Sequence, residues 1–237
     1  MPIISKLPGL KFSANTLKYL AIIAMTIDHI ALLFVPADSS LYAVMRIIGR
    51  LTAPIMSFFI AEGFRYTRNY WAYIRRLAVF AVISQPVYFI MLFGRSPNNA
   101  TEFLMHLNVM YTFIISLLIL KVINTDKINV CGKIALCILC LILSMFGDWI
   151  YFIPAWVLIF HWFRNDYKKK AALFSIIAVF SCFQFGVLQL GTLLALIPLN
   201  MYSGERGAGG NKVVNKWIFY LFYPLHILIL ILIKHFI

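Results

Sequence analysis

Residues 17–36 read LKYLAIIAMTIDHIALLFVP, an apolar run long enough to cross a bilayer as a single helix. Two ionisable residues, Asp28 and His29, lie next to each other in the middle of this run. A charged side chain at the centre of a membrane helix costs about 2.5–3.5 kcal/mol on insertion scales, so such residues usually face the inside of a helix bundle and mark function. We therefore expect this helix to carry part of a functional site.

The whole chain has the composition of an integral membrane protein. Of its 237 residues, 62% are hydrophobic and 12% are charged, and the mean hydropathy is +0.89. These values lie outside the range of soluble globular domains. The net charge is +13, but the basic residues form small clusters between apolar segments. Positive-inside membrane topology explains such clusters better than nucleic-acid binding does.

The pattern predicts an all-α polytopic transmembrane bundle of about nine helices, forming one domain over residues 1–237, because no linker or internal repeat divides the chain. With a cytoplasmic N-terminus, most of the 21 basic residues fall on the cytoplasmic side. For residues 171–201 we expect two helices that turn near Gly186. The alternative is a single tilted helix, but it would place the basic loop 203–216 on the outer side of the membrane. The predicted segments are 17–36, 42–63, 77–93, 104–123, 132–146, 149–163, 171–184, 186–201 and 217–236.

The second segment supplies cationic partners for the buried acid. Arg46 and Arg50 are four residues apart and therefore share one helix face. Adjacent helical residues point about 100° apart, so Asp28 cannot orient His29 and must pair with another helix. We expect Asp28 to pair with Arg46 or Arg50, leaving His29 as a general acid or base. The alternative is a purely structural ion pair beside a packing histidine.

Several motifs occur together along the chain. They read LKYLAIIAMTIDHI from Leu17, RIIGRLTAP from Arg46, AEGFRYTR from Ala61, LNV from Leu107, GERG from Gly204 and FYLFYPLH from Phe219. In this order and over nearly the whole chain, they resemble the TraX family, which is named for the protein that N-acetylates F-type conjugative pilin. The chain also resembles, more distantly, the integral-membrane acyltransferases, in which a histidine of the first helix is implicated in acyl transfer from a coenzyme-A thioester.

The resemblance implies an acetyl-CoA-dependent acyltransferase of a bacterial cell membrane, with an amine or hydroxyl acceptor on a peptide, lipid or glycan. His29 is the carried-over catalytic candidate, and Asp28, Arg50 and His226 match motif positions. His226 follows Pro224, and its alternative role is a packing hydrogen bond to a backbone carbonyl. No metal and no nucleic acid are expected. Cys137 and Cys140 lie inside an apolar helix and are interpreted as packing residues.

Coenzyme A is polyanionic, so we expect arginines on the cytoplasmic face to bind its phosphates. The alternative is that these arginines serve only to set the membrane topology. The glycine-rich loop 203–212 carries Arg206, but its sequence matches neither the P-loop nor the dinucleotide fingerprint. The expected substrate-binding residues are Arg46, His106 and Asn108, with Asn108 or an arginine stabilising the oxyanion. The expected phosphate-binding residues are Arg65, Arg68, Arg75, Arg76 and Arg206.

A membrane transporter or flippase is the alternative function, since buried ionisable residues also serve proton relays and substrate paths. No inverted repeat supports it. Saturable binding of a coenzyme-A thioester would favour the enzyme, whereas proton-coupled flux without acyl turnover would favour the transporter.

Overall fold

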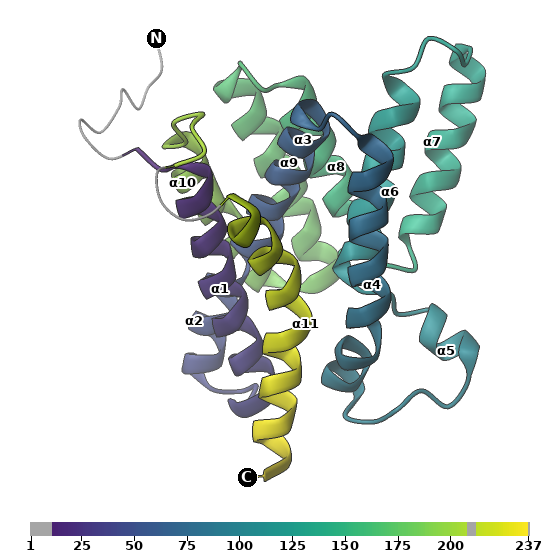
Figure 1. Ribbon diagram of the computed structural model, residues 1–237. Coiled ribbons are helices and arrows are strands. Elements are labelled where there is room, and N and C mark those ends of the chain that lie inside the picture. Colours follow the sequence, from purple (N-terminus) through teal and green to yellow (C-terminus); the bar gives the residue numbers. More distant parts are fainter. Residues whose placement is uncertain (1–10, 208–211, 237) are drawn as a thin grey trace. The chain divides into compact units, whose positions relative to one another are not determined.

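The computed structural model describes residues 11–207 and 212–236, and within them the regular structure is helical, with two isolated β-bridges and no strand (Figure 1). The predicted all-α class is confirmed, and each predicted apolar segment contains helix. The helices are α1 (Ala14–Phe34), α2 (Ser40–Gly49), α3 (Thr52–Tyr66), α4 (Tyr70–Phe93), α5 (Ala100–Leu104), α6 (Val109–Ile123), α7 (Val130–Ser144), α8 (Phe152–Trp162), α9 (Tyr167–Phe185), the 3₁₀ helix η1 (Val187–Ala195), α10 (Leu196–Asn200) and α11 (Lys212–Phe236).

Four helical stretches are long and apolar enough to span a membrane: Ala14–Phe34, Ser40–Tyr66, Tyr70–Phe93 and Trp217–Phe236. Four further apolar helices are shorter, namely Val109–Ile123, Val130–Ser144, Phe152–Trp162 and Val187–Asn200. Along α7, Ile134, Ile138 and Ile142 are more than half exposed, which suits a lipid-facing surface. The chain is therefore a multi-pass helical membrane protein. The cytoplasmic N-terminus stays a prediction.

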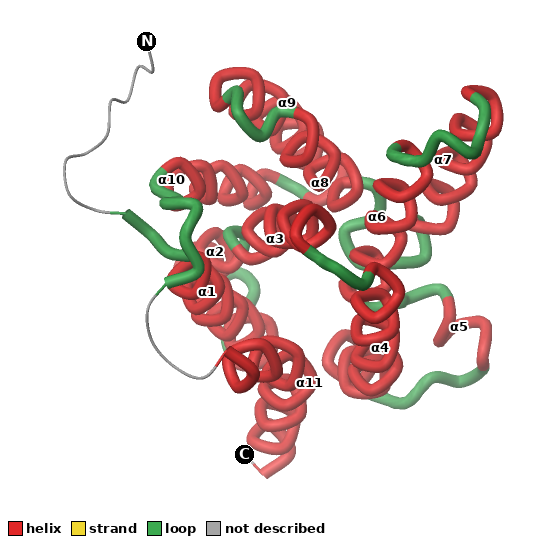
Figure 2. Tube along the Cα trace, turned by 45° about the horizontal axis from the view of Figure 1, so that its top comes forward, coloured by secondary structure: helices red, strands yellow, loops and turns green. Residues whose placement is uncertain are grey.

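The chain forms two compact units that interleave in sequence. The first unit contains residues 1–56 and 162–222, and the second contains residues 57–161 and 223–237. In the first unit α1 lies beside α2, and η1 packs on α2 and α9; in the second unit α6 lies between α4 and α7 (Figure 2). Each unit draws on both halves of the chain, and the single domain over 1–237 stays a prediction.

The sequence predicts one continuous helix over 42–63, but in the structure this helix is interrupted. Helix α2 ends at Gly49, Arg50 and Leu51 form a turn, and α3 begins at Thr52. Pro54 explains the break, because its ring clashes with the carbonyl four residues earlier, at Arg50, and it donates no N–H. The break places Arg50 at the end of α2, where its backbone N–H still bonds to Arg46 O.

The predicted turn near Gly186 is confirmed. Helix α9 ends at Phe185, and Gly186 has φ +87°, which favours glycine because other residues would be strained there. Val187 then starts η1, which packs on α9 in the same unit. The segment 171–201 is therefore not one long tilted helix: α9 ends before Gly186, and a second helical stretch made of η1 and α10 follows it.

The core of the second unit is built on α6, whose side chains are buried over much of its length. Ile115, Ile119 and Cys140 form one apolar cluster, with Cys137 packed against it. All four cysteines are free thiols. The interpretation of Cys137 and Cys140 as packing residues is confirmed.

Candidate functional site

An ion triad links α1 to α2 in the first unit. Arg46 Nη1 donates to Asp28 Oδ2 over 2.7 Å, and Arg50 Nη2 donates to Asp28 Oδ1 over 3.1 Å. The exposed fractions of the side chains are 16% for Asp28, 19% for Arg46 and 9% for Arg50. The predicted pairing of Asp28 with an arginine is confirmed, and both arginines take part. The interrupted segment therefore still presents the two guanidinium groups on one side.

Two glycines let the helices approach the triad closely, and sequence reasoning missed both. A Cβ atom on Gly49 would overlap the Asp28 carboxyl group and its Cβ. A Cβ atom on Gly191, in η1, would lie 2.5 Å from Ile47 O and 3.1 Å from Arg50 Cβ. The only signal in the sequence is a glycine between the two arginines of RIIGR. The triad thus needs small residues on α2 and on η1.

His29 follows Asp28 on α1 and is half-buried. The position next in sequence turns its side chain about 100° away from that of Asp28, so His29 does not share the Asp28 face. The Arg46 guanidinium lies over the Tyr42 ring, 5.7 Å from the centroid, which adds a cation–π contact to its ion pair with Asp28. His29 is therefore an imidazole one residue after a carboxylate whose charge is already bound by two cations.

Arg206 lies in a loop that covers the start of α1. Ala14 N donates to Glu205 O over 2.8 Å, and Asn15 N donates to Arg206 O over 3.2 Å. The Ser13 hydroxyl caps Thr16 N, so the first amides of α1 bond to protein oxygens and do not form an anion site. Lys18 is close enough to interact electrostatically with Arg206, and it adds a second cation that the sequence analysis did not assign to this site. Residues 208–211 of the loop and the Lys212 side chain lie outside the described residues.

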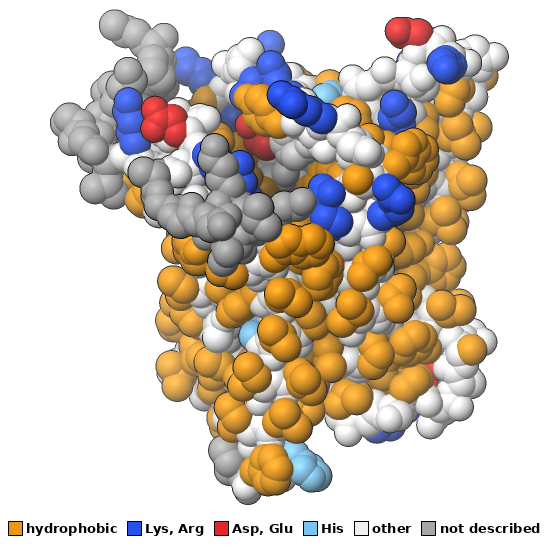
Figure 3. Space-filling model, viewed as in Figure 1, with side chains coloured by type: hydrophobic (Ala, Val, Ile, Leu, Met, Phe, Trp, Pro, Cys, Tyr) orange, Lys and Arg blue, Asp and Glu red, His pale blue; other side chains and the backbone are white. Residues whose placement is uncertain are grey.

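The other predicted phosphate ligands lie in the second unit, at the end of α3 and the start of α4. Arg65, Arg68 and Arg75 are exposed, whereas Arg76 is half-buried. Arg76 Nε is buried and has no hydrogen-bond partner among the described residues, and the guanidinium lies 5.8 Å from the Tyr73 ring centroid. Figure 3 shows Lys and Arg side chains gathered around the start of α4 and apolar side chains along the rest of it. The expected cofactor-binding arginines are thus divided between the two units.

Asn108 caps α6 and holds that helix to α4. Its Nδ2 donates to Gln85 Oε1 over 2.8 Å and to Ala81 O over 2.7 Å, and its Oδ1 accepts from Met110 N over 3.0 Å. Gln85 Nε2 in turn donates to His106 O over 2.7 Å. Asn108 is 1% exposed. These bonds give Asn108 a structural role, while its oxyanion role stays a prediction.

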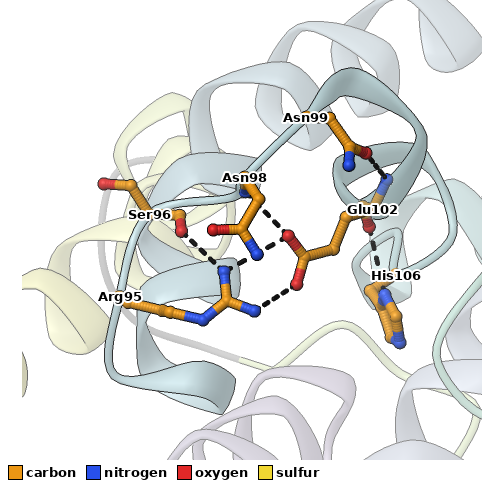
Figure 4. A network of polar contacts seen from close by, with 6 residues as sticks. All are labelled: Arg95, Ser96, Asn98, Asn99, Glu102 and His106. Atoms are coloured by element: carbon orange, nitrogen blue, oxygen red, sulfur yellow. Dashed lines mark hydrogen bonds and ion pairs between the residues drawn. The ribbon is translucent and has the colours of Figure 1, made fainter.

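His106 belongs to an exposed network in the loop between α4 and α6 (Figure 4). Arg95 forms a two-armed ion pair with Glu102, and Asn98 N donates to Glu102 Oε2 over 2.7 Å. The Arg95 hydrogen bond, followed by that of Asn98 N, lowers the pKa of Glu102. His106 Nδ1 lies 3.1 Å from Glu102 O, and its ring meets Phe93 edge-on at 4.8 Å. The substrate-binding role of His106 stays a prediction.

His226 lies in the second unit, so the four predicted catalytic residues are divided between the units as well. It is 6% exposed, and its ring centroid is 6.1 Å from that of Tyr223. Asp148, which sequence reasoning did not single out, interacts electrostatically with Tyr223 and with Tyr88. Among residues 11–207 and 212–236, no group of three or more His, Cys, Asp or Glu side chains has the arrangement of a metal site.

Comparisons with known proteins give matches over nearly the whole chain. The family model described as TraX protein matches residues 13–234. A probable fimbrial assembly protein FimC, serogroup H1, of Dichelobacter nodosus is 34% identical over 237 residues, which cover 94% of this chain and 96% of that relative. No solved structure gives a match.

Proposed function

This chain belongs to the TraX family, and on that premise we propose that it is a membrane acyltransferase that moves an acetyl group from acetyl-CoA to an amine or hydroxyl acceptor. The observation that carries the proposal is the ion triad beside His29, in which Arg46 and Arg50 both bind Asp28. The two arginines hold the charge of Asp28, so His29 is the group of this helix turn that is suited to proton transfer.

The proposed reaction needs one base and one oxyanion donor. The acceptor nitrogen or oxygen attacks the carbonyl carbon of the thioester while His29 takes the acceptor proton. The tetrahedral intermediate then collapses, the carbon–sulfur bond breaks, and the coenzyme-A thiolate leaves with the proton that His29 took from the acceptor, which returns His29 to its neutral form. Arg46 is our candidate oxyanion donor, because a guanidinium carries five N–H donors and the described contact with Asp28 uses Nη1.

The phosphates of the cofactor require cations at the cytoplasmic surface. In the second unit, Arg76 supports this role best because its Nε is buried without a hydrogen-bond partner in the described part of the chain. Arg65, Arg68 and Arg75 add exposed positive charge near it in sequence. In the first unit, Arg206 with Lys18 offers a second pair of cations. Arginine suits phosphate because it binds two oxygens at once.

The acceptor is proposed from the names of related proteins. The TraX family is named for pilin acetylation, and the relative of Dichelobacter nodosus is described as a probable fimbrial assembly protein. We propose that the acceptor is the N-terminal amine of a membrane peptide such as a pilin, and that the protein resides in the bacterial inner membrane. A lipid or glycan hydroxyl is the alternative acceptor.

The test uses His29→Ala with His235→Ala as the matched control, since His235 is exposed near the end of α11. Purified protein in nanodiscs is given acetyl-CoA and a peptide with a free N-terminus, and acetylated peptide is measured by mass spectrometry. We expect His29→Ala to lose about 10² to 10⁴-fold of the turnover, the usual contribution of general acid–base catalysis, and His235→Ala to lose none.

Two results would contradict the proposal. The first is unchanged turnover by a folded His29→Ala protein. The second is proton-coupled flux across vesicles by the parent protein without any acyl transfer to peptide, lipid or glycan, which would establish a transporter.

A further inference from the structure

The turn between α7 and α8 is fixed to the start of α6. Leu107 N donates to Phe146 O over 2.7 Å, and Asp148 N donates to Leu107 O over 2.9 Å. The Thr112 hydroxyl donates to Asp148 O over 2.8 Å, and a Cβ atom on Gly147 would overlap that hydroxyl. The turn is therefore held by three bonds to the segment that begins α6, and two of them involve the backbone of Asp148.

The residues after Asp148 have strained backbones. Trp149 has φ +59° and Ile150 has φ +42°, and the left-handed region is unfavourable for bulky and β-branched residues. Such conformations persist where the surrounding structure determines them, and they concentrate at functional sites. Trp149 N donates to Asp148 Oδ1 over 3.0 Å, so this strained turn also orients the carboxylate.

Two buried tyrosines from different helices lie near this carboxylate. Tyr88 on α4 is 6% exposed and Tyr223 on α11 is 5% exposed, and Asp148 interacts electrostatically with both. The Tyr223 hydroxyl also makes a hydrogen bond with the backbone of Val109, the first residue of α6. His226 follows one turn later on α11. One unit thus gathers a carboxylate, two phenols and an imidazole.

A buried hydroxyl on the same face of α4 lacks a partner. Ser84 is 0% exposed, and its Oγ has no hydrogen-bond partner among the described residues. It lies four residues before Tyr88, which places both side chains on one face of the helix. Its neighbour Gln85 is satisfied by Asn108 and His106. A buried hydroxyl without a hydrogen bond is unfavourable, so the position of Ser84 on the same helix face as Tyr88 points to a ligand that supplies the missing bond.

We propose that Asp148, Tyr88, Tyr223 and Ser84 form a binding site for a protonated primary amine. The carboxylate balances the positive charge, the hydroxyl oxygens accept its N–H donors, and the tyrosine rings present their negative faces to a cation. Asp148 is half-buried, whereas the two tyrosines are buried and lower the local polarity around it. A single carboxylate suits an ammonium group better than a metal ion, which needs several anionic or imidazole ligands.

The test measures binding without any acyl donor, so it is independent of the proposed transfer reaction. The probe is an uncharged peptide amide with a free N-terminus and a C-terminal fluorophore, and its N-acetylated form is the matched control ligand. Anisotropy is recorded with the protein in phosphatidylcholine nanodiscs. We expect the parent protein to bind the free amine at least about tenfold more tightly than the acetylated peptide, a difference of about 1.4 kcal/mol.

Asp148→Asn should remove this preference, whereas Asp126→Asn, which neutralises an exposed acid of the same unit, should keep it. Gel filtration and tryptophan fluorescence report on folding. If Asp148→Asn does not fold, Tyr88→Phe and Tyr223→Phe remove one hydroxyl each and should lower the preference severalfold. Equal binding of the two peptides by the parent protein, or an unchanged preference in folded Asp148→Asn or in both tyrosine variants, would overturn the site. A parent protein that prefers the free amine yet transfers no acetyl group would contradict only the proposed enzyme.

Discussion

Asp28 and Glu102 are both carboxylates that bind arginine, and their surroundings are opposite. Asp28 lies between α1 and α2 with a side chain that is 16% exposed, and Arg46 and Arg50 both bind it. Glu102 lies in the loop after α4, paired with an Arg95 side chain that is 46% exposed. A charge removed from water becomes costly when its partner is lost, whereas an exposed pair is screened by solvent. The same chemistry therefore has a large structural consequence at Asp28 and a small one at Glu102.

The largest effect is expected from Asp28→Asn, which leaves two largely buried guanidinium groups without their carboxylate. Breaking a buried pair on one side typically costs about 3–5 kcal/mol, so the unfolding midpoint in micelles should fall markedly. Asp126→Asn is the control, because it removes an exposed acid from a loop. Equal midpoints for the two variants would mean that burial gives the Asp28 triad no special stability.

A smaller loss is expected from Gly49→Ala, since the added methyl group overlaps the Asp28 carboxyl group. Overpacking of this kind costs about 1–3 kcal/mol, measured as the free energy of unfolding in a denaturant series. Gly132→Ala in α7 is the comparison variant: there the new Cβ meets side-chain atoms of Ile128 and of Asn129, whose Oδ1 caps the helix, so at most the cap is lost, at about 1 kcal/mol. If both alanine variants are equally stable, the close approach at Gly49 does not constrain the triad.

The smallest effect is expected from Glu102→Gln, and it should depend on pH. The Arg95 and Asn98 hydrogen bonds lower the pKa of Glu102 below its ordinary value of 4.5. The stabilisation is therefore present above that value and is lost as the pH falls through the lower folded-state pKa. The gap in unfolding temperature between parent and variant should be small at pH 7 and should close in acid. A gap that widens in acid would contradict this assignment.

Reading the residues located the triad because charge and depth are local properties of a helix. Asp28 stands out in an apolar run, and the spacing of Arg46 and Arg50 puts both on one helix side. The turn at Gly186 was accessible for a similar reason, since a basic loop had to stay on the cytoplasmic side. The break at Arg50 was missed because apolar composition continues through Leu51 and Thr52, although Pro54 was a signal for it.

The proposed amine site was invisible to that reasoning. Asp148 follows an apolar segment and looks like an ordinary turn residue, while Tyr88 and Tyr223 look like ordinary aromatic residues of membrane helices. Asp148 and Tyr223 both come to the start of α6, because the turn after α7 is bonded there and because Tyr223 bonds to the backbone of Val109. The spacing of residues within one helix cannot predict a contact that depends on how other helices pack.

The amino-acid sequence by itself determined the helical class, the apolar segments and the identity of the acid and its cationic partners, because hydropathy, charge and helical spacing act over a few neighbouring residues. Only the tertiary structure decided that both arginines bind Asp28, that Gly49 and Gly191 must be small, and that Asp148 lies near Tyr88 and Tyr223. These outcomes depend on how closely backbones approach across helices, and close packing sets that distance from all of the contacting side chains together.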